Sequence, residues 1–405
     1  MKILILGVGA QGSTVAERMD EEPNVEEIIC ADRDRKSVDG IVNLLKKGRG
    51  AIADGSDVDS IVKAADGVDL IVNALPIAFA PNVLEAAIRV GANYQDFATT
   101  DVLDEWWPTC VEMLYNDYGS RFKEIGKMAV IGTGSAPGMM CVAAKNSMKY
   151  LDSCDDILMM VYEGVEAKRF LPFWWSPFTA LSDMVDPTFA LVDGELVETE
   201  PHSLPVTRHF KGCEKPVTLV EHAHDETVFL GLNKDTHFKG VKNVNFKYGG
   251  VGIDYATPLY RAGLLNREEE TFKGHTFIPF DVVLSHLPPA PRLPEEVKEI
   301  LDEGLVKDEG AFVVESTGYK DGKKVLVETY LYAPGCEESY QRAKLSGEQY
   351  LTGQCGYLFT KMFVEGDYDQ TGLISSDMLT QEEVDKYLDY AAKFDITLEV
   401  EVKEL

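Results

Sequence analysis

A glycine-rich segment near the start of the chain restricts the fold more than any other feature. Residues 7–12 read GVGAQG, directly after the apolar run KILIL and directly before a segment with helical periodicity. An apolar strand that turns sharply through such glycines into a helix is the first half of a βαβ unit. In this pattern Gly7 permits the tight turn, Gly9 lets the backbone approach a phosphate, and Gly12 lets the helix pack closely on the strand.

The first 131 residues repeat this alternation of short apolar runs and helical segments. Strands are expected at residues 2–6, 26–31, 50–53, 69–74, 93–97 and 128–131. Helices are expected to begin near Gly12, Ser37, Asp57, Ala80 and Glu105. Because the apolar runs are nearly continuous, both faces of the sheet should be covered. We therefore predict an α/β fold whose first domain, residues 1–135, is a doubly wound parallel sheet of the Rossmann type.

The pattern changes after Gly138. A helix over residues 139–150 is followed by longer alternating runs that turn at residues 193–194 and 320–323, as hairpins do. These runs predict a second, α+β domain over residues 136–338 with a mostly antiparallel or mixed sheet. Beyond a proline-rich connector at residues 287–294, helical periodicity returns, so residues 339–405 are expected to form helices that pack on the first domain.

Asp32 lies twenty residues after Gly12, at the end of the second expected strand, which completes the context of a dinucleotide-binding turn. The backbone amides of Ala10 and Gln11 should face a pyrophosphate at the helix N-terminus. Asp32 should accept hydrogen bonds from ribose hydroxyls and repel a 2′-phosphate, which favours NAD. The neighbouring Arg33 could hold that phosphate, so NADP is the alternative. A purely structural glycine turn is the competing interpretation.

Later strand ends should contribute to the same site, since ligands bind outside the carboxyl ends of parallel strands. Asp54 would lie near the adenine, and Asp96 close to the nicotinamide, where it is a candidate catalytic residue. Ala74, Leu75 and Pro76 would lie near the central riboses. Ordinary turn chemistry is the alternative at each position.

The amino-acid composition limits the classes of molecule that the protein is expected to bind. The chain has 39 basic and 68 acidic side chains, a net charge of −29 that repels nucleic acid and anionic membranes. No apolar run approaches the ~18 residues that a membrane span needs. Seven cysteines form no CxxC pair, which indicates reduced thiols and a cytoplasmic protein without a zinc site. We expect a small-molecule substrate.

The GVGAQG turn and several further short motifs together resemble the saccharopine dehydrogenase-like family, whose members include lysine 6-dehydrogenase and carboxynorspermidine dehydrogenase. The further motifs are ADRD (31–34), IVNALP (71–76), GANYQDFA (91–98), GTGSAPGM (132–139), WWSPFTAL (174–181) and the pair YKDGKK…YLTGQCGYLF (319–359). The resemblance implies a Rossmann domain completed by C-terminal helices, a second domain that binds substrate and dimerises, and pyridine-nucleotide redox chemistry at a carbon–nitrogen bond. A homodimer is the expected assembly.

The chain also departs from that family. Many relatives read Asp-Pro-Gly where this chain has Ala136, so any role of that acidic residue is absent here. Relatives usually carry paired prolines and a glutamate near the C-terminus, where this chain reads GLISSD at residues 372–377. The substrate is therefore not carried over with the resemblance.

Oxidising an amine requires a base, and all seven histidines fall between residues 202 and 286. The densest polar cluster is EHAHDE at residues 221–226, from which His224 and Glu226 are the candidate catalytic residues. On a strand His222 and His224 would share one face. A metal site or an exposed strand end are the alternatives.

Arg169, Trp174 and Trp175 combine a cation with aromatic rings and are the candidate substrate-binding residues. An arginine fork suits an amino-acid carboxylate. The tryptophans could equally belong to a dimer interface or to the core. Residues 367–378 begin like a calcium loop, but Met378 stands where the bidentate glutamate is required, so no metal is expected.

The leading hypothesis is an NAD(P)-dependent oxidoreductase that acts on a C–N bond of an amino acid, or of an imine formed from an amine and an oxo acid. A carboxynorspermidine-type polyamine reductase is the alternative among enzymes. A non-catalytic dinucleotide-binding regulator is the alternative from another class.

Overall fold

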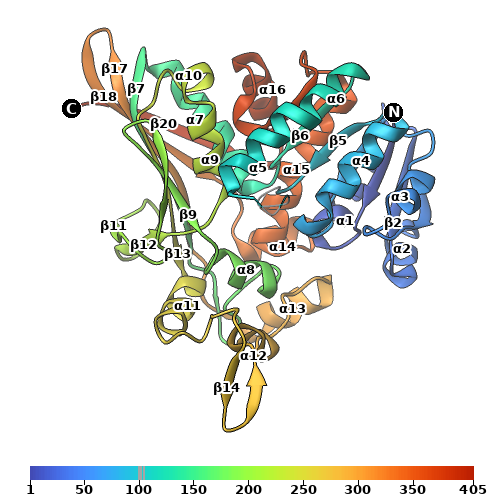
Figure 1. The fold of residues 1–405 in the computed structure, drawn as a ribbon, viewed down its shortest axis with the longest axis horizontal. Coiled ribbons are helices and arrows are strands. Elements are labelled where there is room, and N and C mark those ends of the chain that lie inside the picture. Colours follow the sequence, from blue (N-terminus) through green and yellow to red (C-terminus); the bar gives the residue numbers. More distant parts are fainter. Residues whose placement is uncertain (99–102, 104) are drawn as a thin grey trace. The chain divides into compact units, whose positions relative to one another are not determined.

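The computed structural model describes residues 1–98, 103 and 105–405, which form two compact units (Figure 1). Unit 1 consists of Met1–Lys149, Val228–Lys239 and Leu351–Thr397, and unit 2 of Tyr150–Thr227, Gly240–Tyr350 and Leu398–Leu405. The chain therefore crosses between the units several times, whereas the sequence suggests one boundary near residue 135 and another near residue 338.

Unit 1 is built on a parallel sheet with the strand order β19-β6-β5-β4-β1-β2-β3. The strands are β1 (Lys2–Leu6), β2 (Glu27–Asp32), β3 (Gly48–Ile52), β4 (Leu70–Asn73), β5 (Asn93–Asp96), β6 (Met128–Ile131) and β19 (Gly372–Ser375). This confirms the Rossmann-type sheet and its six expected strands. The order reverses between β1 and β4, where such sheets bind their ligands. Strand β19, from the C-terminal region, is an addition that the sequence patterns do not reveal.

Helices flank this sheet (Figure 1). They are α1 (Ala10–Asp20), α2 (Arg35–Val42), α3 (Val58–Ala64), α4 (Ala80–Val90), α5 (Trp107–Met113), α6 (Gly119–Glu124), α7 (Met140–Ser147), α10 (Lys234–His237) and α16 (Gln381–Ala391). Two further helices, α9 (Asp225–Leu232) and α15 (Gly347–Glu365), have their first residues in unit 2 and the rest in unit 1. Single turns are η1 (Ile77–Phe79), η2 (Leu114–Tyr118), η3 (Ser135–Met139), η4 (Met148–Tyr150), η5 (Ser376–Met378) and η6 (Ala392–Phe394). Asp34 caps α2 by accepting from two backbone amides, and Thr380 with Glu383 forms a capping box on α16.

Helix α15 packs on the Rossmann sheet through buried polar contacts. The Gln95 amide on β5 donates to the carbonyl of Gly356 at 2.8 Å and accepts from the Thr360 hydroxyl at 2.9 Å. At the C-terminal end of α1, Glu22 pairs with Lys361 at 2.6 Å and accepts from the Tyr357 hydroxyl. The C-terminal part of the chain is thus an integral layer of unit 1.

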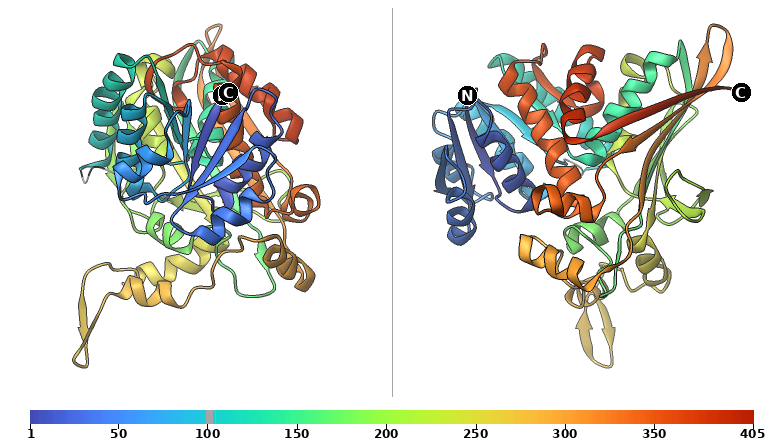
Figure 2. Two further views of the ribbon diagram at one scale, coloured as in Figure 1. Left: turned by 90° about the vertical axis from the view of Figure 1, so that its right-hand side faces the viewer. Right: turned by 180° about the vertical axis from the view of Figure 1, so that it is seen from behind.

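Unit 2 contains a mixed sheet with the order β10-β9-β13-β7-β17-β18-β20, to which β12 and β11 are attached beside β13. Its strands are β7 (Ser153–Glu163), β9 (Thr188–Val192), β10 (Glu195–Thr199), β11 (Val206–Arg208), β12 (Val217–Glu221), β13 (Asn243–Gly250), β17 (Gly310–Lys320), β18 (Lys323–Tyr332) and β20 (Thr397–Glu404). The pair β13–β7 is parallel and most other pairs are antiparallel, which confirms the expected mixed sheet. Figure 2 shows β20 running along this sheet.

The remaining elements of unit 2 are short. Its helices are α8 (Pro177–Asp183), α11 (Val251–Arg261), α12 (Pro279–Ser285), α13 (Pro294–Glu303) and α14 (Cys336–Ala343). Two small strand pairs are β8 (Glu166–Ala167) with β16 (Leu305–Lys307), and β14 (Glu270–Phe272) with β15 (His275–Phe277).

Both expected hairpin turns are present in unit 2. Asp193 and Gly194 have φ values of 50° and 86°, and Asp321 and Gly322 have values of 51° and 77°. Two consecutive positive φ angles match the strand twist in a two-residue hairpin, which is why Asp-Gly is favoured there.

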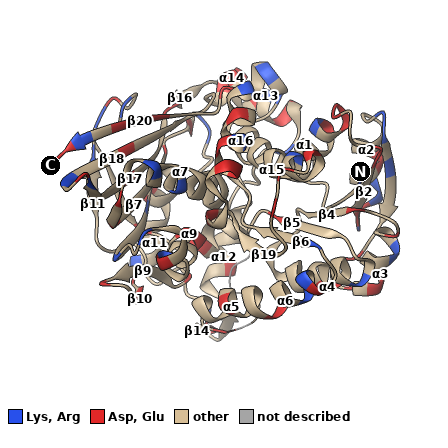
Figure 3. Cartoon of the chain, turned by 90° about the horizontal axis from the view of Figure 1, so that it is seen from above, with Lys and Arg blue, Asp and Glu red and all other residues tan. Residues whose placement is uncertain are grey.

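Basic and acidic residues are interspersed over the helices and strands (Figure 3). Among the described residues, no helix combines the length and apolar character needed to cross a bilayer. No group of three or more His, Cys, Asp or Glu side chains in that part of the chain could hold a metal ion. All seven cysteines are buried free thiols.

Candidate functional site

The three glycines of the turn after β1 have three different environments. Gly7 has φ of +92°, and a Cβ atom there would lie 2.7 Å from the carbonyl oxygen of Ala74. A Cβ at Gly12 would lie 2.0 Å from the carbonyl oxygen of Gly7. A Cβ at Gly9, in contrast, would have no atom within 4 Å. Gly7 and Gly12 are therefore required by packing, and the open space at Gly9, before the N-terminus of α1, suits the pyrophosphate of a dinucleotide.

Asp32 lies at the end of β2 and braces the glycine turn. Its carboxylate accepts from the amide of Val8 at 3.2 Å and from that of Asp34 at 3.0 Å, and the side chain is only partly buried. Since a carboxylate has about four acceptor sites, acceptor capacity remains for ribose hydroxyls. Arg33 is exposed next to it. The Ser56 hydroxyl and amide lower the pKa of Asp54, and the charge of Arg33 lowers it further, so Arg33 and Asp54 share one neighbourhood.

Residues 74–76 leave the sheet beside the glycine turn. The amide of Ala74 donates to the carbonyl of Leu6 at 2.8 Å, and that of Leu75 to the Asn73 side chain at 3.2 Å, ahead of Pro76. The structure thus brings the ends of β1 and β4 together. Ala10 and Gln11 form the first turn of α1, as the sequence predicts.

Asp96 is buried and serves the framework of unit 1. One oxygen accepts from the amide of Gly132 at 2.9 Å and the other from the Tyr94 hydroxyl at 2.9 Å. Burial, together with the charge of Asp96, raises the pKa of Tyr94 well above its usual value, so this hydroxyl keeps its proton. Asp96 therefore anchors the loop after β6.

Sequence reasoning also missed the contribution of α15 to this edge of the sheet. The Thr352 hydroxyl lies 2.8 Å from that of Ser135 in the loop after β6. A Cβ at Gly353 would lie 2.6 Å from a methyl carbon of Thr14 on α1. The glycines of the TGQCGYLF motif are the signal for this close packing.

Unit 2 holds a second polar cluster, in which His222 and His224 lie in the segment between β12 and α9. Their rings are stacked at 6.1 Å; His222 also stacks on Tyr248 at 4.6 Å and His224 on Phe246 at 4.6 Å. Tyr248 and Phe246 share one face of β13, since they are two residues apart. Because β12 ends at Glu221, the two histidines do not lie on a strand, yet both rings stack on residues of the same face of β13.

The two histidines have opposite protonation states, because only His224 lies against carboxylates. Nδ1 of His224 lies 2.5 Å from Oε2 of Glu226, which is fully buried. Burial by itself would lower the pKa of His224, but the charges of Glu226, Asp183 and Asp225 outweigh it and raise the pKa to about 9. Burial and the neighbouring His224 lower the pKa of His222 well below its usual value. At neutral pH one ring is protonated and the other is neutral.

Tyr248 and Glu163 complete this cluster and were not predicted from the sequence. The Tyr248 hydroxyl donates to Oε2 of Glu163 at 2.5 Å, at the end of β7. Burial raises the pKa of the Glu163 carboxyl, and burial together with Glu163 raises that of Tyr248 well above its usual value. Only the pairing of β13 with β7 brings these residues together. We call Glu163, His222, His224, Glu226 and Tyr248 the histidine cluster.

Glu221 is separated from this cluster although it precedes His222 in the chain. It bonds Lys247 at 2.6 Å and Asn245 at 2.8 Å, and both partners lie on the other side of β13 from Tyr248. Both members of the Glu221–Lys247 ion pair are almost completely buried. This pair ties β12 to β13 and thereby fixes where the histidine segment begins.

The predicted substrate-binding residues divide into two groups. Trp175 packs edge-on against Tyr248 with ring centroids 6.4 Å apart, so it borders the histidine cluster. Trp174 is buried in a hydrophobic core cluster, where its indole N–H donates to the carbonyl of Val165 at 3.1 Å. Arg169 forms ion pairs with Glu299 and Glu303 on α13. The structure thus associates Trp175 with the cluster, and gives Trp174 and Arg169 other partners.

Comparison with known proteins agrees with this fold and glycine turn. Residues 3–130 match the family model of the saccharopine dehydrogenase NADP binding domain. Carboxynorspermidine synthase of Vibrio cholerae is 25% identical over 400 residues, covering 94% of this chain and 92% of that protein. Carboxyaminopropylagmatine dehydrogenase of Synechocystis sp. is 24% identical over 394 residues, covering 92% of each.

Solved structures show the same architecture. Saccharopine dehydrogenase (L-Glu forming) of Saccharomyces cerevisiae superposes with a TM-score of 0.67 at 14% identity, covering 99% of both chains. Homospermidine synthase of Legionella pneumophila, solved in complex with NAD, has a TM-score of 0.66 at 11% identity and covers 100% of this chain and 91% of that one. Together with the dinucleotide turn, the matched domain and the full-length relatives make the chain an NAD(P)-dependent oxidoreductase that is similar to the saccharopine dehydrogenases.

Proposed function

We propose that this enzyme interconverts a secondary amine and the imine formed from an amine and an amino-acid semialdehyde, a polyamine-type C–N oxidoreduction. The carrying observation is the histidine cluster, in which a protonated His224 lies among buried carboxylates. The two full-length relatives are by name a carboxynorspermidine synthase and a carboxyaminopropylagmatine dehydrogenase, which supports a carboxylated polyamine over lysine.

In this reaction the protein would donate one proton to the substrate nitrogen or accept one from it. The bound nicotinamide supplies or accepts the hydride. Nδ1 of His224 is held by Glu226, so Nε2 is the ring atom that can give a proton to the substrate nitrogen or take it back. Glu226 keeps the ring oriented and favours its protonated form, as a carboxylate does for a catalytic imidazole. Neutral His222 stacks on Tyr248 beside it.

The charge of the cluster suits a cationic substrate. Glu163 and Glu226 belong to the cluster, and Asp183 raises the pKa of both His224 and Tyr248. Buried carboxylates favour the binding of ammonium groups, and Trp175 adds an aromatic face at the border. A diamine carries such groups at both ends. Among the sites predicted from sequence, His224, Glu226 and Trp175 enter this proposal, with Asp32 and the glycine turn for the dinucleotide.

Turnover tests this proposal directly. The appearance of reduced nicotinamide is followed with NAD and with NADP, using carboxynorspermidine, carboxyaminopropylagmatine, saccharopine and lysine in parallel. We expect turnover with a carboxylated polyamine, and a large loss of kcat in His224→Gln while dinucleotide affinity is retained. Turnover of saccharopine or lysine alone would contradict the polyamine assignment. Dinucleotide binding without any turnover would favour a regulator.

We further propose a cytoplasmic homodimer. The seven buried free thiols support a reducing compartment, and the dimer follows from the family resemblance. Light scattering at several concentrations measures the assembly, and the mass of a single chain would contradict the dimer.

A further inference from the structure

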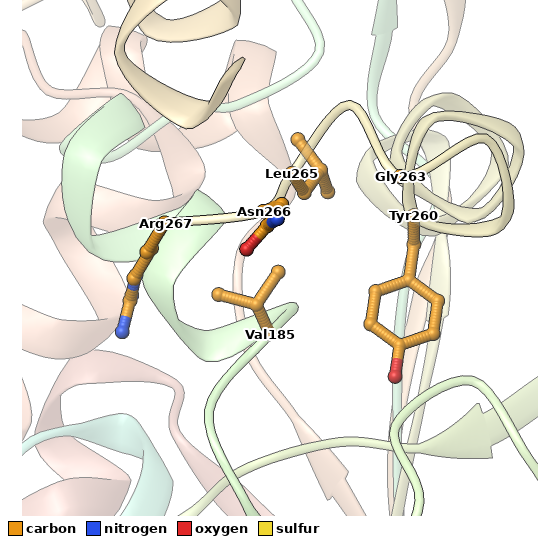
Figure 4. A pocket seen from close by; sticks show the side chains of 6 residues that line it. All are labelled: Val185, Tyr260, Gly263, Leu265, Asn266 and Arg267. Atoms are coloured by element: carbon orange, nitrogen blue, oxygen red, sulfur yellow. The ribbon is translucent and has the colours of Figure 1, made fainter. Parts of the chain in front are cut away.

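Unit 2 has a cavity of about 300 Å³, and none of the residues that line it belongs to the dinucleotide turn or to the histidine cluster. It is lined by Val185, Tyr260, Gly263, Leu265, Asn266 and Arg267. Figure 4 shows Arg267 and Tyr260 on opposite sides of Val185, with Asn266 between them. The volume is at the lower end of the range for small-molecule sites, about 300–1,000 Å³. It suits the end group of a metabolite more than an entire cofactor.

The charged residue in the lining is held in a defined orientation. Nη1 of Arg267 bonds Asp186 at 2.5 Å, and the guanidinium lies 5.0 Å from the ring centroid of Phe280. A guanidinium offers five N–H donors in a planar fork, so one bond to Asp186 leaves donors for a second carboxylate. Asn266 is fixed in turn, because its amide donates to Glu270 at 3.1 Å. The cavity lining thus contains one cation, Arg267, and the carboxylates of Asp186 and Glu270 bond two of the lining residues.

The opposite wall is aromatic and equally well supported. The Tyr260 ring packs against His202 with centroids 4.7 Å apart. His202 is buried; its Nε2 donates to the carbonyl of Met184 at 3.0 Å, which leaves Nδ1 to accept from the Thr257 hydroxyl at 2.9 Å. Burial lowers the pKa of His202 and raises that of Tyr260, so the imidazole is neutral and the phenol keeps its proton.

Four consecutive residues connect this cavity with the histidine cluster. The carbonyl of Asp183 accepts from the amide of Ala223, between the two histidines, and its charge raises the pKa of His224. Met184 bonds His202, Val185 lines the cavity, and Asp186 holds Arg267. Residues 183–186 therefore contact both the cavity lining and the histidine cluster.

We propose that this cavity binds the amino-acid head of the substrate, with its carboxylate on Arg267 and its ammonium group toward Asp186 and Glu270. A zwitterionic head matches a lining whose arginine is paired with Asp186 and whose Asn266 bonds Glu270, whereas a purely cationic end would meet the guanidinium. This inference rests on the proposed function, since it assigns one end of that substrate. It names Arg267 as the residue that selects carboxylated over plain amines.

Binding of two unreactive probes tests the proposal without any turnover. L-2,4-diaminobutyrate and 1,3-diaminopropane differ only in the carboxylate, and calorimetry on the full chain measures their dissociation constants. We expect the wild type to prefer L-2,4-diaminobutyrate by about tenfold or more, the factor that one charge-assisted hydrogen bond supplies. In Arg267→Met this preference should disappear. In the control Arg292→Met, at an exposed arginine of the same unit, it should be unchanged.

Equal binding of both probes, tighter binding of 1,3-diaminopropane, or a preference that survives Arg267→Met would overturn the proposal. If Arg267→Met fails to fold by circular dichroism, Arg267→Lys replaces it: a lysine keeps the charge but lacks the planar fork, so a smaller preference for L-2,4-diaminobutyrate is expected, and an unchanged preference would contradict the site. The binding test involves no hydride transfer, so its outcome is independent of turnover. Absence of turnover would refute the proposed function but would not affect the measured preference for the carboxylated probe. A missing preference would refute the assignment of Arg267 but would not affect the turnover result.

Discussion

The Nδ1 atom of His224 lies 2.5 Å from Oε2 of Glu226, and this carboxylate has no exposed surface. The two residues are separated by one position, at the junction of a loop and the first turn of α9. A buried anion fixed this closely makes the imidazole a cation at neutral pH, although burial by itself would favour the neutral ring.

The His224–Glu226 pair predicts a specific pH dependence of stability. The pKa of His224 is raised from 6.5 to about 9 in the folded protein, so its stabilising contribution is complete below about pH 6.5 and is lost as the pH rises through 9. Urea unfolding should therefore show a free energy of unfolding that declines between these pH values. In Glu226→Gln the decline should be much smaller. An identical slope in both proteins would contradict the assigned cation.

Two glycines of the dinucleotide turn, Gly9 and Gly12, should respond differently to substitution by alanine. Gly9→Ala adds a methyl group to open space, so the protein should fold with wild-type stability and lose dinucleotide affinity. Gly12→Ala places that methyl group 2.0 Å from a carbonyl oxygen and should cost at least about 1–3 kcal/mol of stability. Thermal unfolding and fluorescence titration with NADH and NADPH measure the two effects. Normal affinity in a folded Gly9→Ala would remove the turn from the binding site.

Asp32 and Arg33 should determine which dinucleotide binds. In Asp32→Ala we expect weaker NAD binding, by about tenfold or more, because the ribose hydroxyls lose a charged acceptor. In Arg33→Ala we expect weaker binding of NADP alone, since only a 2′-phosphate needs that cation. Asp39→Ala, at an exposed position on α2, is the control. Equal changes for both dinucleotides in Arg33→Ala would contradict a contact with the 2′-phosphate.

The buried Glu221–Lys247 ion pair should be strongly coupled. Lys247→Met leaves the Glu221 carboxylate buried without its cation, which should cost about 3–5 kcal/mol of stability. The double variant Glu221→Leu with Lys247→Met removes both charges and should recover most of that loss. Denaturant unfolding of the two single variants and the double variant forms the cycle. Additive losses would show that the pair does not interact as described.

Tyr248→Phe should lower kcat while the protein still folds. The variant keeps the ring that stacks on His222 and removes the hydroxyl that bonds Glu163. Loss of this donor leaves a buried carboxylate, so the pKa of Glu163 should rise further above its usual value. We expect a lower kcat and a pH–rate profile shifted at its acidic limb, with dinucleotide affinity unchanged. A profile identical to wild type would remove Tyr248 from the reaction.

The sequence by itself determined the elements whose signals are local. The apolar runs, the GVGAQG turn, Asp32 and the two Asp-Gly hairpins each specify their structure within a few neighbouring residues, because side-chain periodicity and positive φ angles are local properties. The family motifs are local in the same sense. They were sufficient for the fold class and the kind of chemistry.

Only the tertiary structure decided which distant residues meet. Strand β19 joins β6 from more than 200 residues away, and Glu163 meets Tyr248 through the pairing of β7 with β13. Asp96 has a structural role because its carboxylate accepts hydrogen bonds from Gly132 and Tyr94. Glu221 is not part of the histidine cluster because its partner Lys247 and the cluster residue Tyr248 are adjacent on β13 and therefore point to opposite faces. Strand pairing and the face on which a side chain lies depend on the packing of the whole unit, which no local pattern encodes.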